Sequence, residues 1–186
     1  MCWPIIIYGT KPSAGEIMKL FAVYVGGETE QSNIELHDLR FSIGDTIEDC
    51  YADLKSQWWG IPESLHLDAW GAVEFADGYH ITLKSEPYNG PQKLFFVNLG
   101  GYDPAQFTEL HSNIFVVAES DSKAKVQALK TIPDWQSHHR DYLYEIENLF
   151  DLNKVANDRG LHIHLEKTDA EAPFDFTAKY VPIGKE

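Results

Sequence analysis

The chain has 186 residues, of which 44% are hydrophobic and 24% charged, and this globular composition excludes a disordered or fibrous protein. Its 29 acidic residues outnumber its 15 basic residues and give a formal net charge of −14. Because no basic run occurs, the sequence favours neither nucleic acid nor an anionic membrane as a partner. Every apolar run is also far shorter than the roughly 20 residues that cross a bilayer.

The N-terminal segment, residues 1–17, contains several prolines and glycines that interrupt regular structure before Met18. We interpret it as an N-terminal arm or a mis-called start. A secretory signal would have basic residues before its apolar patch, and this segment has none there. The two cysteines, Cys2 and Cys50, cannot build a disulfide framework, so a reduced, cytoplasmic location is expected.

An internal repeat is the clearest pattern in the chain. The sequence KLFAVYVGG at residues 19–27 returns as KLFFVNLGG at 93–101, and ten of the 23 residues from Lys19 onward are identical to those 74 positions later. Such self-similarity indicates a tandem duplication. The predicted organisation comprises the arm at 1–17, a first unit at 18–85, a linker at 86–92, a second unit at 93–168 and a C-terminal tail at 169–186.

Each unit is predicted to have the element order ββαββ. A strand that ends at a Gly-Gly pair precedes a second strand that begins at a Glu-Leu-His triplet, and an amphipathic helix follows. Asp45 with Glu48 resembles a capping box for the first helix, whereas Ser120 or Asp121 begins the second. The Asp-Gly pair at 77–78 predicts a tight hairpin between the last two strands of the first unit.

These elements predict an α+β fold of two tandem homologous ββαββ units, with mainly antiparallel sheet, helices packed on one side and a pseudo-twofold relation between the units. Alternating aromatic residues between Phe174 and Tyr180 favour an edge strand in the tail. The Gly-Gly pairs are interpreted as tight turns or bulges that need a positive φ.

Seven acidic and histidine residues are candidates for ligand binding. Glu35 and His37 share one face of a strand, as do Glu109 and His111 in the second unit, because alternate residues of a strand point the same way. If both pairs converge across the pseudo-twofold axis, two imidazoles and two carboxylates could form a metal site or an acid-base cluster. The full set of candidates is Glu35, His37, Asp38, His66, Asp68, Glu109 and His111.

Structural roles for the same residues stay open. Each histidine could instead donate a hydrogen bond to its carboxylate partner and hold the loop between two strands, and the presence of the pair in both units slightly favours this interpretation. His66 and Asp68 form a further same-face pair, which would join His37 if their strands are neighbours. The His-x-His-x-Glu stripe at 162–166 has metal-ligand spacing but is more typical of a solvated strand face.

Several of these motifs also resemble a known family. The strand sequence KLFAVYVGG, the Glu-x-His-Asp stretch at 35–38, HLDAW at 66–70 and FFVNLGGY at 95–102 occur in the order typical of the uncharacterised bacterial family named domain of unknown function 1543. The resemblance covers roughly residues 18–166. It implies no particular reaction, because the family has no assigned activity.

No nucleophile or phosphate-binding signature accompanies these patterns. Tryptophans near the helix ends, among them Trp58 and Trp135, are interpreted as core residues rather than as a ligand pocket. Two functions stay open: a small cytoplasmic module that binds a small molecule or a protein, and, as the alternative, a metal-dependent enzyme that uses histidines and carboxylates at the junction between the units. No catalytic residue, definite metal ligand or cofactor is assigned, and the pattern is compatible with a homo-oligomer.

Overall fold

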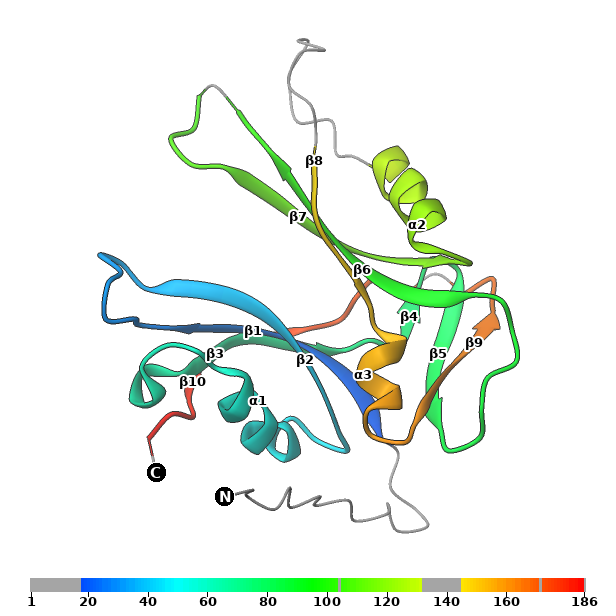
Figure 1. The fold of residues 1–186 in the computed structure, drawn as a ribbon, viewed down its shortest axis with the longest axis horizontal. Coiled ribbons are helices and arrows are strands. Elements are labelled where there is room, and N and C mark those ends of the chain that lie inside the picture. Colours follow the sequence, from blue (N-terminus) through cyan, green and yellow to red (C-terminus); the bar gives the residue numbers. More distant parts are fainter. Residues whose placement is uncertain (1–17, 104, 132–144, 171, 186) are drawn as a thin grey trace, which may run out of the picture.

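The fold is α+β with mainly antiparallel sheet, as the sequence predicts (Figure 1). The structure, a computed structural model, describes residues 18–103, 105–131, 145–170 and 172–185. The expectations for the arm at 1–17 and for Trp135 fall outside these residues. In the part of the chain that is described, no helix is long and apolar enough to cross a membrane.

The first sheet has four strands in the order β10-β3-β1-β2, and each neighbouring pair is antiparallel. In that order the strands span Thr177–Pro182, His66–Ala72, Lys19–Gly27 and Leu36–Gly44. The connection from β2 to β3 contains a 3-10 turn at Glu48–Cys50, helix α1 at Tyr51–Gln57 and a second 3-10 turn at Pro62–Ser64.

The second sheet has three antiparallel strands in the order β7-β6-β8, which span Leu110–Ala118, Lys93–Gly101 and Glu145–Asp151. Helix α2 (Asp121–Ala128) and a 3-10 turn at Leu129–Thr131 follow β7. A third, smaller sheet has the order β4-β5-β9, with strands at Phe75–Ala76, Tyr79–Lys84 and His162–Lys167. Helix α3 (Asn153–Asn157) lies between β8 and β9.

The two larger sheets have matching registers. Each residue pair between β1 and β2 has a counterpart 74 positions later between β6 and β7, so that Lys19 pairs with Gly44 and Lys93 pairs with Ala118. The ladders from β1 to β3 and from β6 to β8 also shift register at corresponding positions. The division of the chain into two homologous units is a prediction with which these registers agree.

The central strands β1 and β6 are buried on both faces, which explains their nearly continuous apolar sequence. On the outer face of β1, Phe21, Val23 and Val25 pack with Leu54 of α1, and the corresponding residues of β6 pack with α2. On the inner face, Leu20 and its neighbours join residues from β2, β6, β7, β9 and α3 in one core. Figure 1 shows α1 and α2 on opposite outer sides of the two facing sheets.

The inner faces become polar toward the Gly-Gly ends of β1 and β6. In β1 the alternate residues after Ala22 are Tyr24 and Gly26, and in β6 the residues after Phe96 are Asn98 and Gly100. Because these side chains cannot continue the apolar contact between the sheets, the space between the sheets opens into two adjoining cavities of about 320 and 440 Å³. The site described below lies on this inner face.

The Asp-Gly hairpin and the start of α2 agree with the sequence. Asp77 and Gly78, between β4 and β5, both have positive φ, as a tight hairpin turn requires. The side chain of Ser120 accepts a hydrogen bond from the backbone N–H of Lys123 and so caps α2.

Two local expectations are wrong. The Gly-Gly pairs lie inside strands β1 and β6, and among the described glycines only Gly78 and Gly160 have positive φ. The first helix has no side-chain N-cap. Asp49, rather than the predicted Asp45 and Glu48, accepts hydrogen bonds near the start of that segment, from the backbone N–H and hydroxyl of Thr46.

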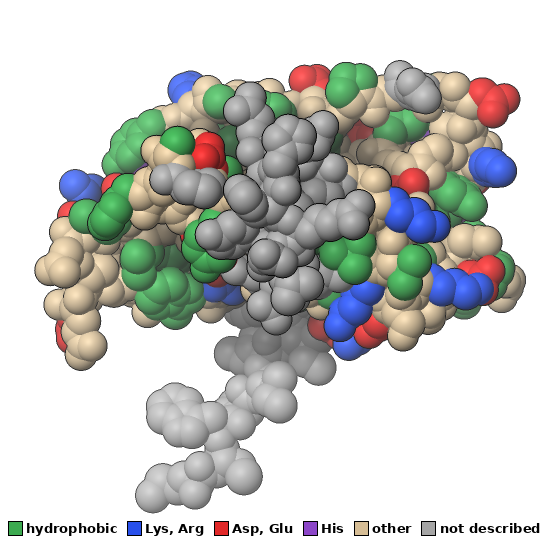
Figure 2. Space-filling view, turned by 90° about the horizontal axis from the view of Figure 1, so that it is seen from above, with side chains coloured by type: hydrophobic (Ala, Val, Ile, Leu, Met, Phe, Trp, Pro, Cys, Tyr) green, Lys and Arg blue, Asp and Glu red, His purple; other side chains and the backbone are tan. Residues whose placement is uncertain are grey.

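The surface carries mixed charge. Figure 2 shows acidic, basic and hydrophobic side chains interspersed over the described residues of one face. This visible part of the surface does not form the continuous basic face with which proteins bind nucleic-acid phosphates.

Asp77 joins the two halves of the fold, and its replacement tests that role. Its carboxylate accepts hydrogen bonds from the backbone N–H of Val117 and from the side chain of Gln127. We expect Asp77→Ala to lower the free energy of unfolding by about 2 kcal/mol, because alanine disfavours positive φ and leaves the Val117 N–H without its acceptor. Asp77→Asn keeps an acceptor and tolerates positive φ. In urea denaturation its free energy of unfolding should therefore fall by less than about half as much as that of Asp77→Ala.

Asp77 should also give stability a dependence on pH. Burial raises the pKa of the Asp77 carboxyl, against a smaller opposing effect of the hydrogen bond from Val117. The folded state therefore holds this proton more tightly than the unfolded chain, and the contribution of the group to stability decreases as pH rises between the two pKa values. Asp77→Asn should remove this decrease of stability with rising pH. If the variant kept the pH dependence of the native protein, the raised pKa of Asp77 would not be its cause.

Candidate metal centre

Two histidines from different strands lie on either side of one glycine. Gly26 in the central strand β1 pairs with His37 of β2 and with His66 of β3, so the three residues form one row across the sheet. Residues in register on neighbouring strands project to the same face, and glycine leaves the middle of this row without a side chain. The two imidazoles can therefore approach each other above β1.

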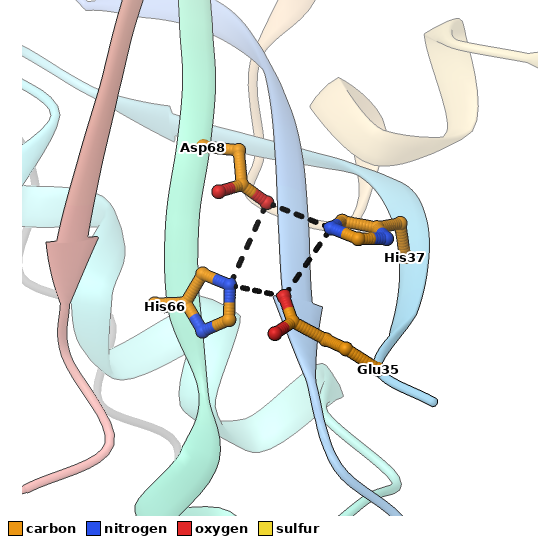
Figure 3. Close-up of side chains that lie close together, drawn as sticks. All are labelled: Glu35, His37, His66 and Asp68. Carbon is orange, nitrogen blue, oxygen red and sulfur yellow. Dashed lines mark ion pairs between the residues drawn. The ribbon is translucent and has the colours of Figure 1, made fainter. Parts of the chain in front are cut away.

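Two carboxylates complete the group, which Figure 3 shows converging above β1. The Nε2 atom of His66 lies 2.6 Å from Oε1 of Glu35 and 3.6 Å from Oδ2 of Asp68. The Nε2 atom of His37 lies 3.3 Å from the same Glu35 oxygen and 3.2 Å from the same Asp68 oxygen. All four atoms lie within 4.8 Å of one another.

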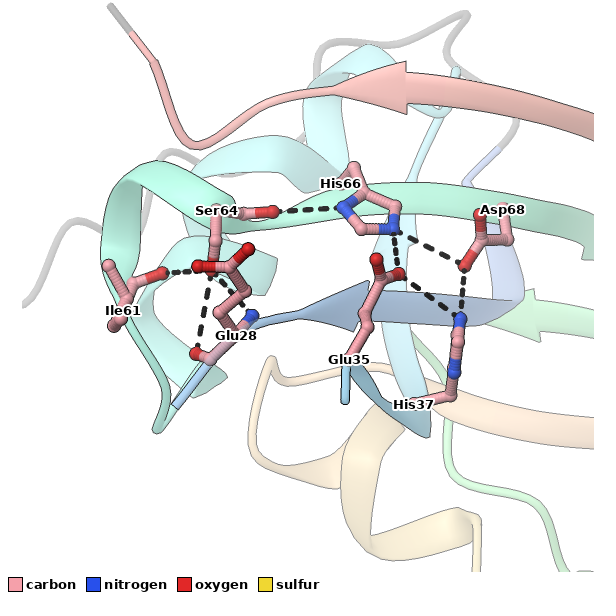
Figure 4. A network of polar contacts seen from close by, with 7 residues as sticks. All are labelled: Glu28, Glu35, His37, Ile61, Ser64, His66 and Asp68. Carbon is pink, nitrogen blue, oxygen red and sulfur yellow. Dashed lines mark hydrogen bonds and ion pairs between the residues drawn. The ribbon is translucent and has the colours of Figure 1, made fainter. Parts of the chain in front are cut away.

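The orientation of His66 is fixed by a backbone carbonyl (Figure 4). Its Nδ1 atom lies 2.9 Å from the carbonyl oxygen of Ser64, which can only accept, so Nδ1 carries a proton. The Ser64 hydroxyl holds this turn by accepting from the N–H of Glu28 and donating to the carbonyl of Ile61. In neutral His66, Nε2 therefore presents its lone pair toward the carboxylate of Glu35.

The contact between Glu35 and His66 brings two electron-rich atoms together. A carboxylate oxygen and an imidazole lone pair repel each other at 2.6 Å unless a proton or a metal cation lies between them. His66 is only 4% exposed in its side chain, so water does not relieve the repulsion from its side. Metal-bound histidines commonly donate their other ring N–H to a backbone carbonyl, as His66 does to Ser64.

Asp68 reaches the cluster from a β-bulge. Tyr24 pairs with Ala69 and Val25 with Leu67, which leaves Asp68 as the additional residue of β3. Its Oδ2 atom is buried and has no hydrogen-bond partner among the described residues. A buried carboxylate oxygen without a donor is costly, and a bound cation would satisfy it.

Gly26 provides the space for the cluster. A Cβ atom at this position would lie 2.6 Å from both Oε1 of Glu35 and Nε2 of His66, and 2.9 Å from the His37 ring. Any other residue at position 26 would therefore displace these side chains. This close approach, rather than a positive φ, accounts for the first glycine of the pair.

The four imidazole-to-carboxylate distances are close to the ligand spacing around a tetrahedral ion, and the two remaining atom pairs lie within 4.8 Å. Ligand atoms that bind Zn²⁺ at about 2.0–2.1 Å in tetrahedral geometry lie about 3.3 Å apart. The four contacts between imidazole and carboxylate atoms range from 2.6 to 3.6 Å around this value. Glu35, His37, His66 and Asp68 could therefore hold one ion with small movements of their side chains.

Aromatic rings flank both histidines. The Tyr24 ring stacks on His37 with a centroid distance of 5.3 Å and an interplanar angle of 7°. The Tyr180 ring of β10 lies 4.5 Å from the His66 ring. Burial raises the pKa of the Tyr24 phenol, and the negative charges of Asp68 and Asp38 raise it further.

The other predicted site residues lie outside this cluster. Asp38 forms an ion pair with Arg40 at 2.6 Å. His111 lies on β7 of the other sheet and Glu109 directly precedes that strand, and their side chains approach to 3.8 Å. Among the described residues the four-member cluster contains neither of them, so it forms within the first half of the chain rather than by convergence of the two Glu-x-His pairs.

The His-x-His-x-Glu stripe on β9 is not part of a metal-ligand cluster among the described residues. His164 Nε2 lies 2.8 Å from the carbonyl oxygen of Glu86, and Glu166 pairs with Lys84. His164 and Glu166 therefore have polar partners outside β9.

Sequence reasoning found all four clustered side chains but missed the residues that position them. Ser64 was missed because it acts through its backbone carbonyl, which leaves no side-chain signal. The sequence favours a turn at Gly26, whereas its neighbours in the sheet, His37 and His66, explain it. The aromatic partners Tyr24 and Tyr180 come from strands whose adjacency only the sheet topology shows.

The corresponding register of the second half has a different composition. Gly100 of β6 pairs with His111 of β7 and with Glu145 of β8. Position 145 therefore corresponds in the ladder to His66, and a glutamate stands there in place of the second histidine. Among the described residues, this register of the second half therefore carries one histidine rather than two.

Comparison with known proteins places the cluster in a matched region. Residues 32–83, which include all four clustered side chains, match the family described as Domain of Unknown Function (DUF1543). The protein Il1583 from Idiomarina loihiensis is similar in structure, with a TM-score of 0.66 and 28% sequence identity over 89% of this chain and 97% of that chain. No curated protein matches the sequence.

A substitution at Gly26 tests the crowding in the cluster. We expect Gly26→Ala to lower the free energy of unfolding by about 2 kcal/mol, because the new methyl group meets Glu35 and His66. In the double variant with Glu35→Ala, the loss caused by Gly26→Ala should be smaller by about 1 kcal/mol, because the truncated side chain leaves space for the methyl group. Urea denaturation with chelator present measures both losses.

Gly44→Ala is the matched control. Its Cβ would lie 2.8 Å from the Thr46 carbonyl oxygen and 2.9 Å from Asp49, at the opposite end of β2 from His37, so it should destabilise the fold without coupling to Glu35→Ala. Equal coupling of both glycine variants to Glu35→Ala would contradict the geometry.

Proposed function

We propose that this protein is a metal-binding protein that holds one divalent ion of the zinc class between Glu35, His37, His66 and Asp68. The observation that carries the proposal is the convergence of two imidazole Nε2 atoms and two carboxylate oxygens within 4.8 Å. The buried Oδ2 of Asp68, which has no hydrogen-bond partner among the described residues, and the 2.6 Å contact between Glu35 and His66, which needs a proton or a cation between the two atoms, support it.

The donor set favours Zn²⁺ over the hard cations. Mg²⁺ and Ca²⁺ prefer six or more oxygen ligands, whereas imidazole nitrogen suits zinc and its neighbours in the first transition row. Two carboxylates also neutralise the charge of a divalent ion. One buried histidine held by a backbone carbonyl reduces the freedom that the ligands lose on binding.

The composition of the site favours metal binding over metal-dependent catalysis. Four protein donors fill the tetrahedral positions of zinc, as in sites that retain their ion, whereas catalytic zinc sites keep one position for water or substrate. Of the two functions that the sequence left open, we therefore infer the binding module, with a metal ion as one of its ligands.

We further infer that the chain consists of two homologous units of which the first carries the metal site. The matched registers of the two larger sheets, 74 residues apart, support a duplication. The replacement of a histidine by Glu145 at the corresponding ladder position supports specialisation of the first unit. This inference predicts a stoichiometry of one zinc ion per chain.

Metal binding can be tested with purified protein that carries no histidine tag. We expect one Zn²⁺ per chain by elemental analysis, and a melting temperature that falls after chelation because the ion stabilises only the folded state. His66→Ala and Asp68→Asn should each weaken zinc binding by at least about 100-fold in a competition assay with a chromophoric chelator.

His111→Ala is the matched control, because it removes the histidine of the corresponding pair in the second half. It should leave zinc affinity unchanged. If His111→Ala also abolished binding, or if the native protein bound no zinc at micromolar concentration, the proposed site would be wrong.

A further inference from the structure

A cleft between the two larger sheets adjoins the cluster. Its apolar half has a volume of about 320 Å³ and is lined by aromatic and aliphatic side chains, among them Trp70, Phe96, Phe115, Phe174 and Phe176. A cavity of this size is at the lower end of the range for small-molecule sites. Aromatic walls of this kind favour a flat aromatic ring, which gains both apolar contact and ring stacking.

The polar half of the cleft has a volume of about 440 Å³ and carries amide groups. Asn98, Asn113 and Asn148 line it, and the Asn98 amide nitrogen donates to the Asn113 amide oxygen at 2.8 Å. Each asparagine amide offers both donors and an acceptor, so the three amides can bind an uncharged polar group that donates a hydrogen bond, accepts one, or does both.

The two halves are continuous. Tyr24, Leu39, Phe96 and Asn113 line both of them, so one molecule can contact the aromatic walls and the amides together. His37 lines the polar half, and its ring stacks on Tyr24. The cleft therefore adjoins the candidate metal centre, and of the four candidate ligands His37 is the one that lines it.

The charges of the cleft disfavour an ionic ligand. No lysine or arginine is among the described residues that line either half, so an anion would find no permanent counter-charge there; His37 and His111 of the polar half are cationic only when protonated. The one lining carboxylate, Asp38, is already paired with Arg40. An ammonium group would likewise lose its hydration without gaining an unpaired carboxylate.

We propose that this cleft binds a small uncharged aromatic molecule of one or two rings that carries a hydroxyl or amide group. The ring occupies the apolar half between Trp70, Phe96 and Phe176, and the polar group contacts the asparagine amides. This site is additional to the metal centre. The aromatic ligand does not need to coordinate the metal ion, because Glu35, His37, His66 and Asp68 already supply four donor atoms to the ion.

A matched series of indoles tests the chemistry of the ligand. Tryptophol is uncharged and carries a hydroxyl group, 3-methylindole lacks the hydroxyl, tryptamine is cationic and indole-3-acetate is anionic. In equilibrium dialysis we expect tryptophol to bind at least about tenfold more tightly than each of the other three. The same order should hold for zinc-loaded and chelator-treated protein.

Variants locate the binding site. Phe176→Ala removes an exposed aromatic ring that lines the cleft, so it should lower the affinity for all four compounds. Asn113→Ala should lower the affinity for tryptophol to that for 3-methylindole. Asn113→Lys adds a cation on an exposed position and should shift the preference toward indole-3-acetate. Phe107→Ala is the control, because this side chain is fully exposed and does not line the cleft.

Several outcomes would overturn the proposal. These are the absence of binding by any of the four compounds at millimolar concentration, equal binding of tryptophol and 3-methylindole, or equal loss in Phe107→Ala and Phe176→Ala. Retained tryptophol binding in a protein that binds no zinc would refute the metal site alone. Zinc binding without tryptophol binding would refute the cleft alone.

Discussion

The packing of the two larger sheets through their inner faces is the constraint on which the rest of the structure depends. Near the start of β1 and β6, apolar residues such as Leu20 and Phe96 join in one core with residues of β9 and α3. Toward the other end the inner positions become Tyr24 and Gly26, which cannot continue that contact. The sheets are therefore held at one end, and the two cavities, one of which is lined by His37 of the candidate metal centre, lie toward the other.

The candidate metal centre depends on a central strand that lacks a side chain at one position. Gly26 lets side chains from both neighbouring strands meet above β1, and the bulge at Asp68 adds a further carboxylate. His66 is buried and oriented by a backbone carbonyl, whereas Glu35 and His37 are partly exposed. One buried ligand held by a backbone carbonyl, with partly exposed ligands on the open side, would let an ion enter while His66 keeps its orientation.

Two local features follow from the sequence because each has a local cause. Ser120 caps α2 through its own side chain, and the Asp-Gly pair sets the hairpin before β5 through its backbone preferences. The Gly-Gly pairs were interpreted wrongly for the same reason. A glycine signals either a positive φ or a close approach, and the close approach to Glu35 and His66 involves residues distant in sequence.

The sequence by itself determined the α+β class with mainly antiparallel sheet, the internal similarity over 74 positions and the list of polar residues from which the cluster is formed. Only the tertiary structure decided which of them meet. Pairing of β1 with both β2 and β3 brings His37 and His66 together, whereas His111 lies on β7 of the other sheet and Glu109 directly precedes that strand. Local preferences act over a few residues, but strand order is set by the burial of whole sheet faces, and one sequence pattern is compatible with several such orders.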